Sequence, residues 1–241
     1  MKDLIKKILR KIGIQLKRYP DDDLARRMKM INNFNIDTLF DIGANEGQYS
    51  RNMRELGYRK KIISFEPLKS AFEELKKASL KDNNWLVNNY ALGNEDIKSM
   101  INVAGNSFSS SILNMLPTHL KSEPESIYIA QEEIEIKKID SIFNSFCNKE
   151  DRVMIKIDTQ GYEKNVIDGA TESLNNIKII QLEMSILPLY ENEILFIEMI
   201  NYLDKKGFQL FSLENGFSDL TTGQLLQVDG IFVQKTFANK V

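Results

Sequence analysis

The chain has 241 residues, of which 42% are hydrophobic and 27% are charged, a composition typical of one soluble globular domain. No apolar run approaches the roughly 20 residues that a membrane span needs, no signal peptide is visible, and a net charge of −2 argues against a general nucleic-acid-binding protein. The single cysteine, Cys147, and the single histidine, His119, exclude an internal disulfide and a Cys/His metal site. We therefore predict a cytoplasmic protein without a metal centre.

The first 18 residues carry a strong positive charge. Seven lysines and arginines stand against one aspartate there, a net charge of +6. Leu4, Ile8 and Ile12 share one face of the helix that this spacing predicts. Such a basic amphipathic helix either packs on the rest of the chain or lies on an anionic membrane surface, at the inner face of the membrane. We assign residues 1–35 to N-terminal helices and residues 36–241 to the main domain.

A strand, a glycine turn and a helix follow one another at the start of the main domain. The apolar run Leu39–Ile42 predicts a buried strand, and Gly43 lets the backbone turn close to a ligand. A helical pattern follows immediately and ends at Gly57. This geometry brings backbone N–H groups and the positive end of a helix to the carboxyl end of a strand, where open α/β sheets bind ligands.

The second strand, Lys61–Phe65, ends at Glu66, which is placed to accept hydrogen bonds from both hydroxyls of a ribose. Two nucleoside cofactors meet that requirement. NAD requires a three-glycine turn, but Asn45 occupies the second glycine position and the third glycine is displaced to Gly47. Asp41 would repel phosphates, whereas it can pair with the ammonium group of S-adenosylmethionine (SAM). We therefore favour SAM over NAD as the cofactor.

Strands and helices alternate along the rest of the chain, which predicts a mostly parallel sheet with helices on both faces. The helices are expected over residues 24–34, 70–80 (opened by a capping box, Ser70 to Glu73), 162–174 and 194–206. The strands are expected over residues 85–89, 100–103, 132–136, 153–157, 178–182, 208–213 and 230–234. No clear helix separates the last two strands, which indicates an antiparallel pair at one edge of the sheet.

Residues 104–131 form an insertion without strong periodicity. Its serine-rich start, Gly105–Ser111, could supply hydroxyls to a polar ligand. A segment of this length in a compact domain is either a lid or binding loop, or a plain surface insertion.

Four motifs in this order resemble the FkbM-type SAM-dependent methyltransferases, over residues 37–233. The motifs are Asp41–Ser50, Phe65–Pro67, Tyr90–Gly93 and Ile155–Glu163. The resemblance implies the class I methyltransferase fold, a Rossmann-like α/β sheet of seven strands, mostly parallel with one antiparallel edge strand. It also implies O-methylation of a sugar or polyketide hydroxyl, and it places the segment from Asn89 to Gly93 along the adenine. The expected cofactor-binding residues are Asp41, Gly43, Asn45, Gly47, Glu66, Asn89 and Ala91.

A sugar hydroxyl is a poor nucleophile while it keeps its proton, so a general base is expected at the carboxyl end of a central strand. Asp158 is the first candidate and Glu183, at the tip of the next strand, is the second; the two could instead share a divalent cation. His119 has a suitable intrinsic pKa but lies in a loop. Two other functions stay open: a nicotinamide-dependent oxidoreductase, and an inactive methyltransferase-like binding module. The expected partner is a glycan or small-molecule acceptor.

Overall fold

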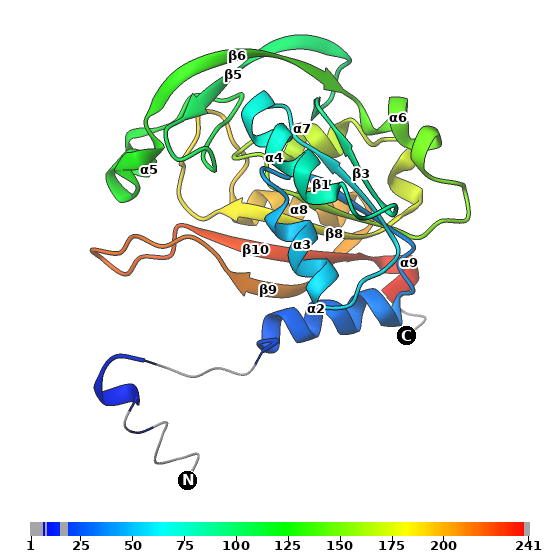
Figure 1. Cartoon of the computed structure of the whole chain (residues 1–241), viewed down its shortest axis with the longest axis horizontal. Helices are drawn as coiled ribbons and strands as arrows, with labels where there is room; N and C mark the ends of the chain where they lie inside the picture. Colours follow the sequence, from blue (N-terminus) through cyan, green and yellow to red (C-terminus); the bar gives the residue numbers. More distant parts are fainter. Residues whose placement is uncertain (1–6, 8, 15–18, 239–241) are drawn as a thin grey trace.

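The structure is a computed structural model that describes residues 7, 9–14 and 19–238 (Figure 1). In this part of the chain the main sheet has seven strands in the order β3-β2-β1-β7-β8-β10-β9. The bounds are β1 (Thr38–Ile42), β2 (Lys61–Phe65), β3 (Trp85–Asn88), β7 (Val153–Ile157), β8 (Ile177–Ser185), β9 (Phe208–Asn215) and β10 (Gln227–Gln234). Only β10 runs against its neighbours β8 and β9. The predicted fold class is confirmed, with the antiparallel strand lying just inside the edge strand β9.

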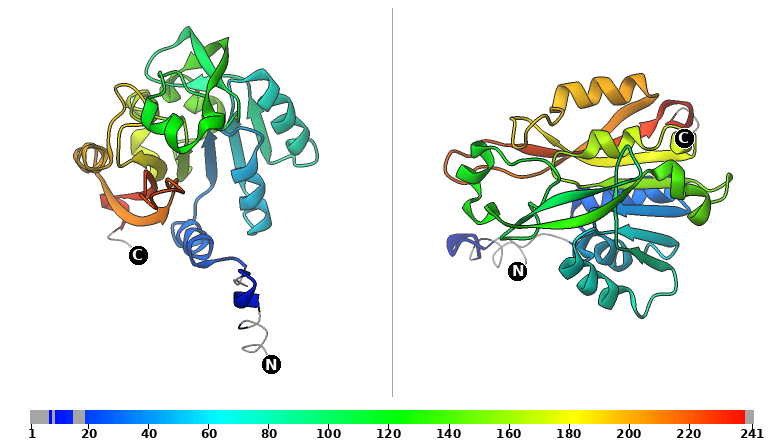
Figure 2. Two further views of the ribbon diagram at one scale, coloured as in Figure 1. Left: turned by 90° about the vertical axis from the view of Figure 1, so that its left-hand side faces the viewer. Right: turned by 90° about the horizontal axis from the view of Figure 1, so that it is seen from above.

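Helices cover both faces of this sheet (Figure 2). The helices α2 (Asp22–Asn33), α3 (Gln48–Glu55) and α4 (Lys69–Ser79) bury apolar side chains against one face, and α6 (Ile139–Phe146), α7 (Glu163–Asp168) and α8 (Phe196–Lys205) against the other. Side chains alternate between the faces along each strand. In β1, Leu39 therefore joins the α2–α3 side, whereas Phe40 and Ile42 join the α6–α8 side.

Two helical predictions are wrong in detail. The capping box at Ser70 does not form, because α4 begins at Lys69 after Leu68 and no side chain caps it. The helix predicted over residues 162–174 stops at Asp168, before a short 3-10 turn at Ser173–Asn175. The interruption is at Gly169, where a Cβ atom would lie 1.9 Å from the Gly93 carbonyl oxygen. Glycine at this position leaves room for the close approach of that distant segment.

The insertion belongs to a second, smaller sheet. Strands β5 (Ile97–Ala104) and β6 (Tyr128–Lys137) form an antiparallel hairpin, and β4 (Ala91–Leu92) pairs with β6. The helix α5 (Pro117–Ser122) and a 3-10 turn (Pro124–Ser126) lie between the hairpin strands. We call residues 97–137 the cover, because this hairpin arches across the main sheet in Figure 1.

The predicted basic helix over residues 1–18 lies largely outside the described residues. Within the ranges that are described, every helix is too short or too polar to cross a bilayer.

Candidate functional site

A cavity of about 260 Å³ lies at the carboxyl ends of β1, β2, β7 and β8, beneath the cover. Residues from the strand ends form one part of its lining: Ile42, Gly43, Asn45, Glu66, Pro67, Leu68, Asp158, Thr159, Gln160 and Glu183. Tyr162 precedes α7, and the remaining lining residues are Ala91, Leu92, Ile101, Ser107, Phe108, Ser110 and Ile112. The sequence predicted a ligand site at this edge of the sheet, and the structure has its cavity there.

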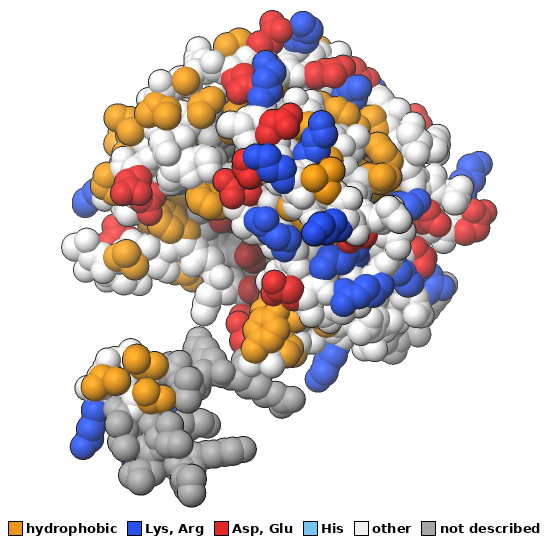
Figure 3. All heavy atoms as spheres, in the orientation of Figure 1, with side chains coloured by type: hydrophobic (Ala, Val, Ile, Leu, Met, Phe, Trp, Pro, Cys, Tyr) orange, Lys and Arg blue, Asp and Glu red, His pale blue; other side chains and the backbone are white. Residues whose placement is uncertain are grey.

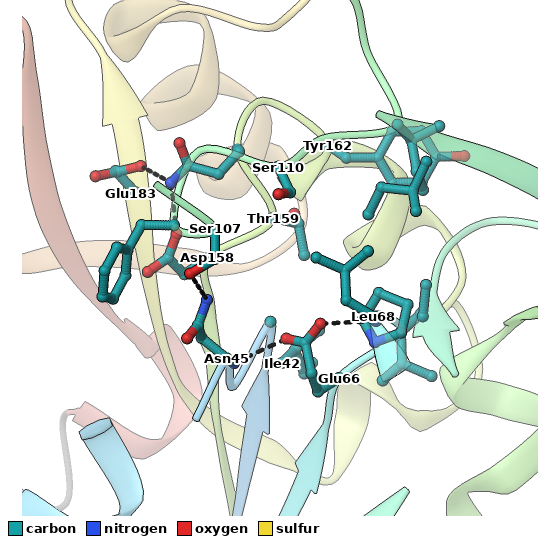
Figure 4. A pocket seen from close by; sticks show the side chains of 18 residues that line it. Ile42, Asn45, Glu66, Leu68, Ser107, Ser110, Asp158, Thr159, Tyr162 and Glu183 are labelled. Carbon is teal, nitrogen blue, oxygen red and sulfur yellow. Dashed lines mark hydrogen bonds between the residues drawn. The ribbon is translucent and has the colours of Figure 1, made fainter. Parts of the chain in front are cut away.

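The two ends of the cavity differ in chemistry. Figure 4 shows Glu183, Asp158 and Ser107 at one end, and Glu66, Leu68 and Tyr162 at the other. Described residues that line the cavity include three carboxylates and no lysine, arginine or histidine. The lining therefore disfavours a phosphate-bearing ligand and favours one that carries positive charge.

The glycine turn after β1 explains two of the predicted residues. Gly43 has a φ of +74°, and a Cβ atom there would lie 1.8 Å from the carbonyl oxygen of Asp158. Only glycine allows the turn to approach the end of β7 this closely. Gly47 does not line the cavity; a Cβ atom there would meet Leu75 and Trp85 at 2.8 and 2.9 Å, so this glycine serves the packing of α3.

Glu66 is 5% exposed and lines the cavity. Its Oε2 accepts a hydrogen bond from the Asn45 backbone N–H and its Oε1 accepts one from that of Leu68, both at 2.8 Å. Burial raises the pKa of Glu66 to about 7 against the effect of these two donors. The two bonds orient the carboxylate while each oxygen keeps acceptor capacity for a ligand.

Three predicted cofactor-binding residues do not line the cavity: Gly47, as described above, and also Asp41 and Asn89. Asp41 is fully buried below it, since its side chain lies on the α3 face of β1, where it accepts a hydrogen bond from Ser50 Oγ (2.6 Å). Asn89 donates hydrogen bonds from Nδ2 to the carbonyl oxygens of Glu66 and Pro67, both at 2.9 Å. Asp41 and Asn89 lie behind the lining, whereas Asn45 and Ala91 are part of it.

The two candidate bases at the strand tips lie together in the cavity. Asp158 accepts hydrogen bonds at both oxygens, from Lys156 Nζ (3.1 Å) and Gln160 Nε2 (2.8 Å). Glu183 accepts from Gln160 (3.0 Å) and Gln227 (2.8 Å), in both cases at Oε2. Among the described residues, Glu183 Oε1 is thus the carboxylate oxygen of this pair without a hydrogen bond. Burial, followed by the charges of Asp158 and Asp229, raises the pKa of Glu183 well above its usual range.

His119 is placed differently from the prediction. It lies in α5 rather than in a loop, is 3% exposed, and does not line the cavity. Its Nε2 lies 3.2 Å from Ser126 Oγ, and its ring packs against those of Tyr190 and Phe217. Burial lowers the pKa of His119 to about 4, so the residue is an uncharged packing element of the cover at neutral pH.

The cover is joined to the site, which favours the binding-loop interpretation over a plain surface insertion. Asn45 Nδ2 lies 3.4 Å from Ser107 Oγ, and Ser111 Oγ donates a hydrogen bond to the Gln160 carbonyl oxygen (2.7 Å). Among the described residues, no group of three or more His, Cys, Asp or Glu side chains is arranged to hold a metal ion.

Gln160 and Tyr190 are functional candidates that the sequence did not single out. Gln160 follows a predicted strand tip within one of the motifs, which was the available signal. Nothing in the sequence around Tyr190 indicated a functional role, because the folding of the chain brings its side chain to Gln160.

The chain is similar in fold to proteins of known structure. A crystal structure of methyltransferase FkbM from Methylobacillus flagellatus KT has a TM-score of 0.51 at 15% identity, covering 82% of this chain and 44% of that chain. TehB from Haemophilus influenzae has a TM-score of 0.48 at 10% identity, covering 91% of this chain and 64% of that one. The chain thus spans less than half the length of the FkbM structure it matches.

A comparison with curated proteins found no match. The family description "Methyltransferase FkbM domain" matches residues 41–210, well over half of the sequence. This span contains all four strand tips that form the cavity. The chain therefore belongs to the FkbM methyltransferase family.

Proposed function

We propose that this chain is a SAM-dependent methyltransferase that binds SAM in the cavity and methylates a hydroxyl group of a glycan or a related small molecule. The observation that carries the proposal is the lining of three carboxylates without a basic side chain. SAM supplies, when bound, a methyl group on a sulfonium centre that an oxygen nucleophile can displace. A cationic, phosphate-free cofactor suits this lining, and the pyrophosphate of a nicotinamide cofactor does not.

The residues present fit SAM at both ends of the cavity. Glu66 is oriented by two backbone donors and retains acceptor capacity, which suits the two hydroxyls of a ribose. The apolar side chains Leu68, Ala91 and Ile101 lie in the lining and suit a flat adenine ring. Asp158 and Glu183 line the other end of the cavity, where a bound sulfonium or ammonium group would favour the ionised form of both carboxyl groups.

We assign the general base to Glu183 in preference to Asp158. Both Asp158 oxygens accept hydrogen bonds from protein donors, whereas Glu183 keeps Oε1 for the proton of a substrate. A raised pKa also makes the Glu183 carboxylate the stronger proton acceptor, once ionised. The cover would then limit the access of water to the cavity. Glu66 would orient the cofactor, and Glu183 would take up the proton of the acceptor hydroxyl at Oε1.

A hydroxyl acceptor is supported by the polar groups beside Glu183. Ser107 and Ser110 of the cover line the cavity and can exchange hydrogen bonds with neighbouring hydroxyls. Figure 3 shows acidic side chains inside a hollow on the face drawn in Figure 1. Such a surface favours a neutral or cationic acceptor over an anionic one. Transfer of a labelled methyl group from SAM to members of a panel of neutral glycans tests the proposal; its absence with SAM bound would indicate a binding module instead.

Replacing Glu66 with alanine should weaken binding of S-adenosylhomocysteine (SAH) roughly 10- to 100-fold. The variant loses its charged hydrogen bonding to the ribose, worth about 1.5–3 kcal/mol in total. Isothermal titration calorimetry measures the affinity. Glu132→Ala is a matched control, because Glu132 also accepts a hydrogen bond from a backbone N–H, that of Lys69, but does not line the cavity. Equal affinities of the Glu66 variant and the parent would show that the ribose is held elsewhere.

A further inference from the structure

Gln160 occupies an unusual backbone position at the end of β7. Its φ is +54°, and that of the next residue, Gly161, is +95°. A non-glycine residue in the left-handed region is uncommon and clusters at functional sites. A Cβ atom at Gly161 would lie 3.0 Å from Tyr190 Cβ, so the turn rests directly on that buried side chain.

Both ends of the Gln160 side-chain amide are held. Tyr190 OH donates a hydrogen bond to Gln160 Oε1 (2.7 Å). Gln160 Nε2 donates to Asp158 Oδ1 (2.8 Å) and to Glu183 Oε2 (3.0 Å). Two carboxylates accept hydrogen bonds at one end of the Gln160 amide, and the Tyr190 hydroxyl donates one at the other end. The amide nitrogen therefore faces the carboxylates and the amide oxygen faces Tyr190. Each amide hydrogen then serves one carboxylate.

This bridge connects two like charges with the cover. Carboxylates this close repel each other and tend to share a proton unless a donor lies between them. The bridge is tied to the cover by Ser111 Oγ, which donates a hydrogen bond to the Gln160 carbonyl oxygen (2.7 Å). The Tyr190 hydroxyl, whose hydrogen goes to Gln160, also lies 3.4 Å from the Ser109 carbonyl oxygen of the cover.

We infer that Gln160, oriented by Tyr190, is a positioning residue that acts through Glu183, holding its Oε2 so that Oε1 remains free for the acceptor proton. The role in methyl transfer rests on the proposed function, whereas the hydrogen-bond bridge does not. A donor to the ionised carboxylate favours the ionised form, so loss of the bridge should raise the pKa of Glu183 further.

Substitutions at Gln160 remove none of the charged groups around Glu183, but they also take a donor from Asp158, so the midpoint belongs to the Asp158–Glu183 pair. Glu183 is faced by the carboxyl groups of Asp158, Asp229 and Glu163 and by the ammonium group of Lys156. Their contributions are present in the parent and in each variant, so a difference between the two reports on the bridge.

The test is a carbon-13 NMR titration of Glu183 in protein without cofactor, with the resonance assigned by Glu183→Gln. We expect Gln160→Leu to raise the titration midpoint of Glu183 by about one pH unit, the effect of one lost hydrogen bond to a charged group. Tyr190→Phe should shift it less, in the same direction, because the amide loses its orientation but not its donors. Gln181→Leu is the matched control: Gln181 Oε1 also accepts from a tyrosine hydroxyl, that of Tyr49 (2.8 Å).

An unchanged midpoint in folded Gln160→Leu would overturn the inference, and if that variant does not fold, an unchanged midpoint in Tyr190→Phe would do so. SAH affinity is measured alongside and should change less than about threefold in Tyr190→Phe, because Tyr190 does not line the cavity. A shifted midpoint together with no SAH binding by the parent would contradict the proposed function alone. Where methyl transfer is observed, Gln160→Leu should have a lower kcat than the parent and a similar KM for SAM. As the pH falls, the variant should lose rate at a higher pH than the parent does.

Discussion

Glutamine in place of Glu183 should lower the rate of methyl transfer about 10²–10⁴-fold, the usual contribution of a positioned general base. Glutamine keeps the size of the side chain but removes the oxygen that takes up the acceptor proton. Because the pKa of Glu183 is raised, the parent should lose rate as the pH falls through that raised value, and the variant should lack this acid limb. Transfer of a labelled methyl group over a range of pH measures both effects.

The matched comparison is Asp158→Asn, at the neighbouring strand tip. Both oxygens of Asp158 accept hydrogen bonds from protein donors, so we expect a smaller loss there than at Glu183. SAH affinity is measured for both variants, because both side chains line the proposed cofactor site. If Asp158→Asn instead loses the greater part of the rate, Asp158 is the base and Glu183 supports it.

Alanine in place of Gly43 should lower the free energy of unfolding by about 2–5 kcal/mol. The left-handed backbone costs a non-glycine residue roughly 1–2 kcal/mol, and overpacking adds about 1–3 kcal/mol. The steric part arises because the new Cβ atom would lie 1.8 Å from the Asp158 carbonyl oxygen. Denaturant unfolding at equilibrium measures the loss.

Gly223→Ala isolates the backbone part of that effect. Gly223 has a φ of +75°, close to the +74° of Gly43, but a Cβ atom there would meet nothing within 4 Å. The control should therefore lose only the conformational share. Equal losses of unfolding free energy in the two variants would mean that the turn after β1 can move away from β7. Close packing of the strand tips would then not be the reason why position 43 requires glycine.

Local pattern was sufficient to predict the sheet and the part of the site formed by short stretches of chain. The turn at Gly43 and the acid at Glu66 follow their strands directly, so strand and turn signals place them at one edge of the sheet. Asp41 was assigned to the ligand because of its charge. The alternation of side chains along β1 places it instead on the α3 face, beside Ser50.

The rest depended on contacts between distant segments. His119 is buried because α5 packs against Tyr190 and Phe217, neither of which is near it in sequence. The bridge at Gln160 needs Tyr190 and Glu183, both beyond the range of any local pattern. Residues 104–131 of the cover likewise lacked periodicity, and their position depends on the pairing of the flanking strands β5 and β6 and on single hydrogen bonds to the strand tips.

Calorimetric titration of the parent protein with SAH, and separately with NADH, tests the central claim most directly. A cavity lined by three carboxylates and no basic side chain should bind SAH at one molecule per chain and give no heat with NADH. Heat with NADH and none with SAH or SAM would contradict the account and indicate a nicotinamide-binding protein on the same sheet.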